Sequence, residues 1–66
     1  MHLNKKSKIF IAGHKGMVGS SILRHFKKQG YENLFVKNRN SLDLTDQKKT
    51  YSYINKIKPN FVIIAA

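Results

Sequence analysis

The most restrictive feature of this sequence is a short apolar run that ends in three evenly spaced glycines. Residues 9–12 are all apolar, and Gly13, Gly16 and Gly19 follow at three-residue intervals. A helical pattern of apolar residues begins at Met17. A buried strand, a glycine turn and a helix in this order are typical of a β-α-β unit whose helix start offers backbone N–H groups to a phosphate.

Each of the three glycines has its own expected role. Gly13 allows a sharp turn at the end of the strand, and Gly16 removes a Cβ where a pyrophosphate has to come close. Gly19 lets the helix pack tightly on the strand. The G-x-x-G-x-x-G spacing is only moderately specific, because a glycine-rich turn without a ligand has the same pattern.

The rest of the chain repeats the alternation of strand and helix. Strands are predicted over residues 8–12, 33–37 and 61–65, and helices over residues 17–29 and 46–57. The strand runs are continuously apolar rather than alternating, as in parallel sheets that are covered on both faces. The prediction is therefore an α/β chain that forms an incomplete Rossmann-type parallel sheet, the N-terminal β-α-β-α-β part.

Apolar spacing also predicts which helix faces pack on the sheet. The first helix is expected to pack through Val18, Ile22, Leu23 and Phe26, with Met17 as a core residue. In the second helix, Tyr51, Tyr53, Ile54 and Ile57 are interpreted as packing residues, and Thr45 is predicted to be the N-cap.

A chain of 66 residues holds one domain at most. Residues 1–7 are expected to be a basic, frayed lead-in, and residues 8–66 a partial, truncated NADP-binding domain. A fully apolar strand beside the last residue needs neighbours on both sides. We therefore expect the chain to be the first part of a longer protein, and the isolated chain to fold poorly or to aggregate.

The net charge of +10, with 13 Lys+Arg against 3 Asp+Glu, raises the possibility of a nucleic-acid partner. The lysines are scattered over predicted solvent-facing positions, which favours a solvated basic surface and no nucleic-acid partner. The chain has no cysteine and no apolar run long enough for a membrane span or a targeting segment. The expectation is a cytoplasmic protein with no membrane partner and no metal site.

The end of the second predicted strand bears on the choice of dinucleotide. An acid at this place accepts the 2′-hydroxyl of NAD, whereas an arginine suits the 2′-phosphate of NADP. Residues 37–40 are Lys, Asn, Arg and Asn, with no acid among them. Arg39 can bind a phosphate with two parallel hydrogen bonds, and Lys15 adds a second cation, so NADP is favoured over NAD. The alternative is that Lys37 and Arg39 are ordinary surface charges.

Three segments of the chain resemble one known family. The segment G-H-K-G-M-V-G-S at residues 13–20 resembles A-G-H-[RK]-G-M-V-G-S of the GDP-L-fucose synthases, in the extended short-chain dehydrogenase/reductase family. Residues 39–46 resemble that family's R-x-x-L-D-L-x-D segment, and residues 59–66 its P-D-x-V-I-x-A-A strand. Lys15 stands where arginine is common, and Asn60 stands where aspartate is common.

The resemblance implies an NADPH-dependent 3,5-epimerase/4-reductase that makes GDP-L-fucose from GDP-4-keto-6-deoxy-D-mannose, with a GDP-sugar substrate and usually as a homodimer. It implies that the last strand lies beside the first, on the side away from the second. It also implies a set of cofactor-binding residues: Gly13, His14, Lys15, Gly16, Met17, Val18 and Gly19 around the pyrophosphate, Arg39 at the 2′-phosphate, Asp43 and Leu44 near the adenine, and Ala65 and Ala66 beside the cofactor.

The catalytic residues of that family are not expected in this chain. The family uses a serine and a tyrosine with a lysine four positions on, and no such set occurs here in the right context. The chain alone is therefore expected to be inactive. Two alternatives remain open at this point: a part of another nucleotide-sugar epimerase or dehydratase, or a small non-catalytic module that binds nucleotides or polyanions.

Overall fold

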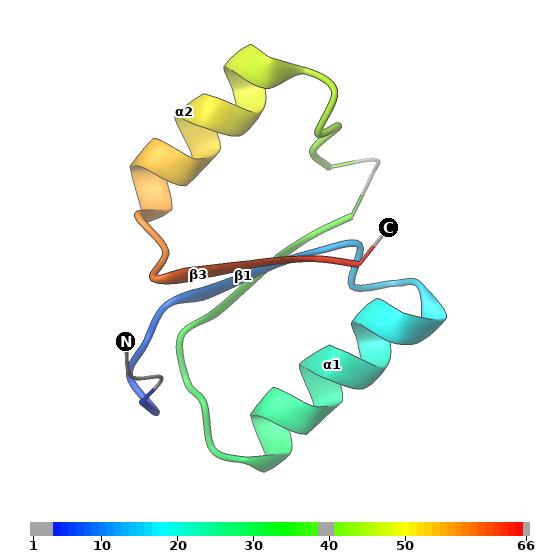
Figure 1. Ribbon diagram of the computed structural model, residues 1–66, viewed down its shortest axis with the longest axis vertical. Helices are drawn as coiled ribbons and strands as arrows, with labels where there is room; N and C mark the ends of the chain where they lie inside the picture. The colour runs from blue at the N-terminus through cyan, green and yellow to red at the C-terminus, as the bar shows by residue number, and fades with distance from the viewer. Residues whose placement is uncertain (1–3, 39–40, 66) are drawn as a thin grey trace.

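The computed structural model describes residues 4–38 and 41–65. Five elements follow one another in the predicted order: β1 (Ile9–Ala12), α1 (Met17–Lys28), β2 (Leu34–Lys37), α2 (Gln47–Ile57) and β3 (Phe61–Ile64). The strands form one parallel sheet in the order β2-β1-β3, and α1 and α2 lie on opposite faces of it (Figure 1). The predicted Rossmann-type arrangement is confirmed, and so is the place of the last strand beside the first.

The central strand β1 forms the middle of the core because it has a paired strand on each side and a helix on each face. Ile9, Phe10 and Ile11 are fully buried. The register pairs Ala12 with Lys37 of β2 and with Ile64 of β3, so all three strands end at one edge of the sheet. Parallel strands of equal length bring their carboxyl ends together, which positions the loops that follow them.

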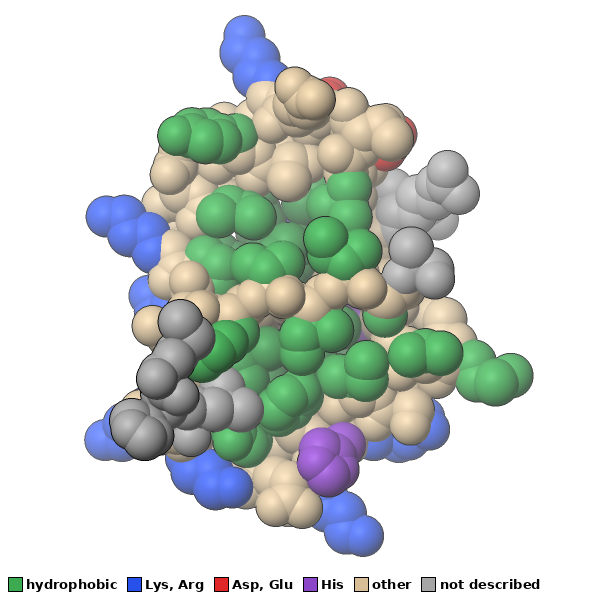
Figure 2. Space-filling view, viewed as in Figure 1, with side chains coloured by type: hydrophobic (Ala, Val, Ile, Leu, Met, Phe, Trp, Pro, Cys, Tyr) green, Lys and Arg blue, Asp and Glu red, His purple; other side chains and the backbone are tan. Residues whose placement is uncertain are grey.

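The side of the sheet that faces α2 carries a buried apolar cluster, and apolar side chains gather between the sheet and α2 (Figure 2). Its buried members are Phe10, Ala12, Leu42 and Ile57, and Phe35, Leu44, Tyr53 and Ile54 pack against them. The prediction for Tyr51 is wrong, because its side chain is 72% exposed. At 3.6 residues per turn the inward stripe of α2 runs through Tyr53 and Ile57, and Tyr51 points well away from that stripe.

The first turn of α1 also differs from the prediction. Ile22, Leu23 and Phe26 are partly buried, as expected for residues that face the sheet. Met17 and Val18, however, are 89% and 65% exposed, so their assignment to the packing face is wrong. The reason is that α1 begins beside the edge where the strands end, and its first turn has no strand beneath it (Figure 1).

The second helix begins at residue 47, one residue later than predicted, and the prediction of Thr45 as its N-cap is wrong. Asp46 is the N-cap, and its side chain accepts a hydrogen bond from the backbone N–H of Lys49. Thr45 instead donates from its hydroxyl to Oδ1 of Asp43 at 2.7 Å. Both residue types cap helices well, but the Thr45 hydroxyl is already bonded to Asp43 and is not available to the helix.

The part of the basic lead-in that the structure describes is held against the domain. The side-chain amide of Asn33 donates to the carbonyl of Lys6, and the backbone N–H of Glu32 donates to the carbonyl of Lys5. Ser7 is buried, and the Lys5 ammonium lies 4.6 Å from the centre of the Tyr31 ring. Hydrogen bonds therefore join residues 4–7 to the residues that precede β2.

Asn60 connects the starts of β1 and β3. Its side-chain oxygen accepts a hydrogen bond from the N–H of Lys8, and its own N–H donates to the carbonyl of Lys8, both at 2.8 Å.

Neither helix in the described residues is long and apolar enough to cross a membrane.

Candidate functional site

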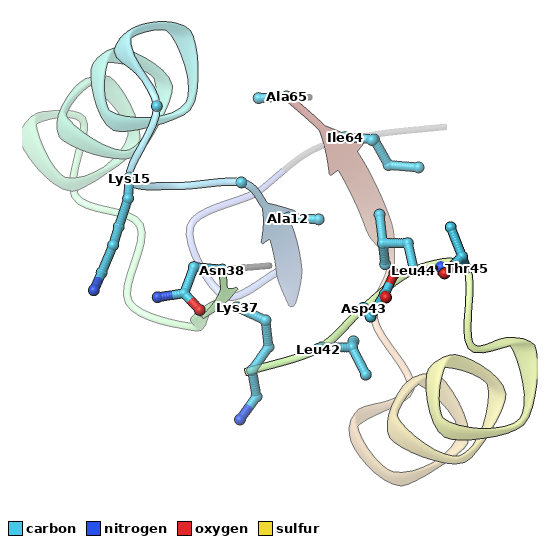
Figure 3. A pocket seen from close by; sticks show the side chains of 12 residues that line it. Ala12, Lys15, Lys37, Asn38, Leu42, Asp43, Leu44, Thr45, Ile64 and Ala65 are labelled. Carbon is cyan, nitrogen blue, oxygen red and sulfur yellow. Dashed lines mark hydrogen bonds between the residues drawn. The ribbon is translucent and has the colours of Figure 1, made fainter. Parts of the chain in front are cut away.

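A pocket lies at the edge of the sheet where the three parallel strands end. Its volume is about 540 Å³, within the usual range for small-molecule sites. The loops that follow β1 and β2 and the residues that end β3 surround it (Figure 3). Its lining residues are Ala12, Gly13, Lys15, Gly16, Lys37, Asn38, Leu42, Asp43, Leu44, Thr45, Ile64 and Ala65.

The glycine loop, residues 13–16, forms one wall of this pocket, and its sharp turn requires glycine at position 13. Gly13 has φ +85°, a left-handed conformation that side chains rarely adopt. Its N–H donates to the carbonyl of Lys37 at 2.9 Å, which ties the loop to the end of β2. A Cβ at Gly13 would overlap the carbonyl oxygen of Ala65, so the backbones of the loop and of the end of β3 touch directly.

The other two glycines of the motif, Gly16 in the loop and Gly19 in α1, have different surroundings. A Cβ at Gly19 would overlap the carbonyl of Gly13, so this residue allows the helix to lie against the loop. A Cβ at Gly16 would meet only the carbonyl oxygen of Gly13, at an ordinary 3.6 Å. Gly16 lines the pocket, and the space beside it is open to a ligand. The expected role of Gly16, close approach of an anionic group, fits this geometry.

The start of α1 carries backbone donors without a protein cap. The N-cap is Gly16, which has no side chain to bond to the helix N–H groups. The first turn that follows contains no acidic residue. The first N–H groups of a helix have no partner inside it, and they carry partial positive charge. An anion at this position would satisfy both, and the exposed Met17 and Val18 flank it.

The loop after β2 forms the opposite wall. The N–H groups of Ser41 and Leu42 both donate to the carbonyl of Asn38, and the Asn38 side chain accepts from Ser41 at 2.8 Å. This turn brings the buried Leu42 and the half-buried Leu44 to the pocket. Oδ1 of Asp43 accepts hydrogen bonds from the N–H and the hydroxyl of Thr45.

The structure brings part of the predicted site together. Of the predicted cofactor-binding residues, six line the pocket: Gly13, Lys15, Gly16, Asp43, Leu44 and Ala65. Four others, His14, Met17, Val18 and Gly19, lie in the glycine loop or the start of α1 but not on the pocket wall. Arg39 and Ala66 lie outside the described residues.

The predicted site did not include several lining residues. They are Ala12, Lys37, Asn38, Leu42, Thr45 and Ile64. The signal that finds most of them is their place in the chain, because they end a strand or follow one directly. In a parallel sheet that position predicts the ligand crevice for any residue type.

Two side chains near the site have notable surroundings. Nδ1 of His14 is buried and has no hydrogen-bond partner among the described residues. The ring of Tyr53 packs edge-on against Phe10 at 5.1 Å, and burial raises the pKa of its phenol above the usual 10.0. No group of three or more potential metal ligands gathers in the described part of the chain.

Comparison with known proteins gives consistent matches over nearly the whole chain. Residues 9–66 match the sequence model of the NAD dependent epimerase/dehydratase family. GDP-L-fucose synthase 1 of Arabidopsis thaliana is 48% identical over 63 residues, which are 96% of this chain and 20% of that protein.

Solved structures give the same picture. The structure of a protein named DdhaC has a TM-score of 0.93 and 51% identity, over 98% of this chain and 19% of that one. MlghC, the GDP-mannoheptose C4 reductase of Campylobacter jejuni solved with NADP bound, has a TM-score of 0.92 and 37% identity over the same shares. The chain therefore spans about a fifth of the length of the relatives it matches.

Proposed function

Because the chain belongs to the NAD dependent epimerase/dehydratase family, we propose that it forms the first part of the NADP(H)-binding domain of a GDP-sugar reductase of the GDP-L-fucose synthase type. The observation that carries this proposal is the pocket at the carboxyl ends of β1, β2 and β3, with an uncapped helix start beside it. Parallel α/β sheets bind dinucleotides at this edge.

The residues of the pocket suit the parts of a dinucleotide. The glycine loop and the first N–H groups of α1 would hold the pyrophosphate, and Lys15 would add positive charge. Leu44 and Asp43 would lie along the adenine, with Ala65 beside the cofactor on the β3 side. We propose Arg39 as the ligand of the 2′-phosphate, from its identity and place in the sequence.

When bound, NADPH supplies the hydride for reduction of a keto sugar. The part of this chain in that reaction is to bind and orient the cofactor, and no catalytic residue is assigned to it. We infer that conversion of GDP-4-keto-6-deoxy-D-mannose requires the remaining length that the relatives have, and that the full-length protein is a homodimer. The 48% identity to a GDP-L-fucose synthase supports this substrate.

A second candidate is a reductase of another GDP-linked sugar. It is favoured by the identity of 37% to a GDP-mannoheptose C4 reductase, over 98% of this chain. The cofactor site is common to both candidates, so the pocket does not discriminate between the sugars.

The test is a hybrid enzyme in which this chain replaces the matching N-terminal fifth of GDP-L-fucose synthase 1 of Arabidopsis. We expect the hybrid to bind NADPH at least about tenfold more tightly than NADH, since the 2′-phosphate contacts are charge-assisted. We also expect it to reduce GDP-4-keto-6-deoxy-D-mannose. The unaltered Arabidopsis enzyme is the control, and a folded hybrid that binds neither dinucleotide would contradict the proposal.

A further inference from the structure

The imidazole of His14 is a polar group that the described part of the fold leaves unpaired. His14 follows Gly13 in the glycine loop but does not line the pocket. The residue as a whole is half-buried, whereas its Nδ1 atom is fully buried and has no hydrogen-bond partner among the described residues. Native proteins pair nearly all buried polar atoms, because an unpaired one destabilises the fold. The ring of His14 therefore needs a partner from elsewhere.

The backbone around His14 is confined on two sides. A Cβ at Gly19 would come within 3.0 Å of the Cα of His14, so the loop lies directly against the first turns of α1. The preceding residue, Gly13, touches the carbonyl oxygen of Ala65, which follows β3. His14 therefore lies where the glycine loop, α1 and the end of β3 meet.

The side of the molecule beyond β3 has further features without partners. Among the described strands, β3 pairs only with β1, so its other edge carries backbone groups that no strand satisfies. Val62 and Ile64 of this strand are 45% and 62% exposed. A hollow of about 460 Å³ between α1 and β3 is lined by Ser21, Ile22, His25, Phe26 and Ile63. These features and the buried Nδ1 atom together indicate that further polypeptide packs beside β3.

We propose that His14 is a positioning residue: in the full-length protein its Nδ1 atom forms a hydrogen bond with a polar group of the polypeptide that follows residue 66, and this bond fixes the glycine loop. The inference rests on the proposed function, because it requires the length that the relatives have beyond this chain, which matches 20% of one of them.

The bond would act on the dinucleotide through the loop. Lys15 and Gly16, the next two residues, line the pocket and adjoin the start of α1. A loop that is held in its binding conformation before the ligand arrives loses less conformational entropy on binding. His14 thus connects the pocket to the rest of the protein without touching the cofactor.

The first test reads the state of the ring in the Arabidopsis hybrid prepared with isotope-labelled histidine. A hydrogen bond at one ring nitrogen fixes the tautomer of a neutral imidazole, and the nitrogen chemical shifts report it. We expect one fixed tautomer for His14 in the absence of NADPH. His25 is exposed and is the matched control, with both tautomers in rapid exchange. Signals that vanish in His14→Phe and in His25→Phe assign the two residues.

The same variants measure what the bond contributes. His14→Phe keeps a planar ring without the hydrogen bond, and we expect it to weaken NADPH binding by the hybrid about tenfold and to lower the thermal midpoint by about 4 °C. His14→Asn returns a polar atom bonded to Cγ, as Nδ1 is, and should restore affinity to within about threefold. His25→Phe should change affinity less than about twofold. If His14 only filled space, the phenylalanine variant would be tolerated better than the asparagine variant.

The outcomes separate this inference from the proposed function. If the folded hybrid binds neither dinucleotide, the proposed function fails, and the role of His14 in binding fails with it. If the hybrid binds NADPH while His14 exchanges freely between tautomers, only this inference is overturned. A tautomer that becomes fixed only after NADPH is added would identify the cofactor as the partner, and it would also overturn the inference.

Discussion

α1 and α2 both lead from one strand to the next, but only α2 begins with a side-chain cap. Asp46 closes the start of α2 by accepting a hydrogen bond from Lys49, whereas Gly16 at the start of α1 offers no side chain. The start of α1 adjoins the pocket through Gly16. The difference indicates that the fold itself caps the start of α2 through one backbone donor, and that the first donors of α1 are left for a ligand.

Among the variants that test the difference between the two helix starts, Gly19→Ala is expected to have the largest effect on stability and on NADPH binding. The added methyl group would overlap the carbonyl of Gly13 and push the first turn of α1 away from the loop. We expect the free energy of unfolding to fall by about 3 kcal/mol or more, with loss of NADPH binding. Urea unfolding and titration of the hybrid enzyme measure both. Ser21→Ala on the exposed face of α1 is the control, and unchanged stability of Gly19→Ala would contradict the packing.

Gly16→Asp would make the start of α1 resemble that of α2. The backbone at Gly16, with φ −71° and ψ 167°, accepts any residue, and a carboxylate there caps a helix. We expect stability to change by less than about 0.5 kcal/mol, because glycine is itself a tolerable cap. NADPH affinity should fall about a hundredfold, because the new charge repels the pyrophosphate.

Gly16→Asn has nearly the same size without the charge and should cost about tenfold in affinity. The two variants together separate repulsion from steric exclusion in a calorimetric titration. An aspartate variant that binds NADPH as the wild type does would show that the anion does not sit at this helix start.

Asp46→Ala removes the side-chain cap at the start of α2. Loss of the cap should lower the free energy of unfolding by about 1 kcal/mol, while NADPH affinity stays within about twofold. Thermal and urea unfolding of the hybrid measure the loss, and Asp46→Asn should retain most of the stability. A large loss of affinity without loss of stability would contradict the division of roles between the two helices.

Thr45→Ala is expected to have the smallest effect. Thr45 is exposed, and its hydroxyl bonds to Asp43 rather than to the helix. The free energy of unfolding should change by at most about 0.5 kcal/mol. The same urea unfolding series measures it, and a loss equal to that of Asp46→Ala would identify Thr45 as the true cap.

The sequence predicted the order of the elements because their signals are local. Continuous apolar runs, the glycine turn and Gly30, which has the expected left-handed φ of +90° after α1, all act within a few residues. The place of β3 beside β1 came from the family resemblance, since the pairing order of parallel strands depends on contacts distant in the chain.

The site was less predictable than the fold. Met17 and Val18 have helical apolar spacing, but spacing does not say where the strand beneath a helix ends. Thr45 and Asp46 are both good caps, and the choice between them depends on how the preceding turn places Asp43. Lys37 lines the pocket because it ends a parallel strand, a position that predicts the crevice although the residue type does not.

The direct contact of Gly13 with Ala65 has a consequence for the synthesis of the chain. The glycine turn is made early, yet its backbone rests on a residue of the last strand, and the N–H of Ala65 bonds to the carbonyl of Ala12. The turn therefore lacks one of its supports until β3 has left the ribosome and paired with β1. A nascent chain that is paused before β3 would carry the complete glycine motif but no finished dinucleotide pocket.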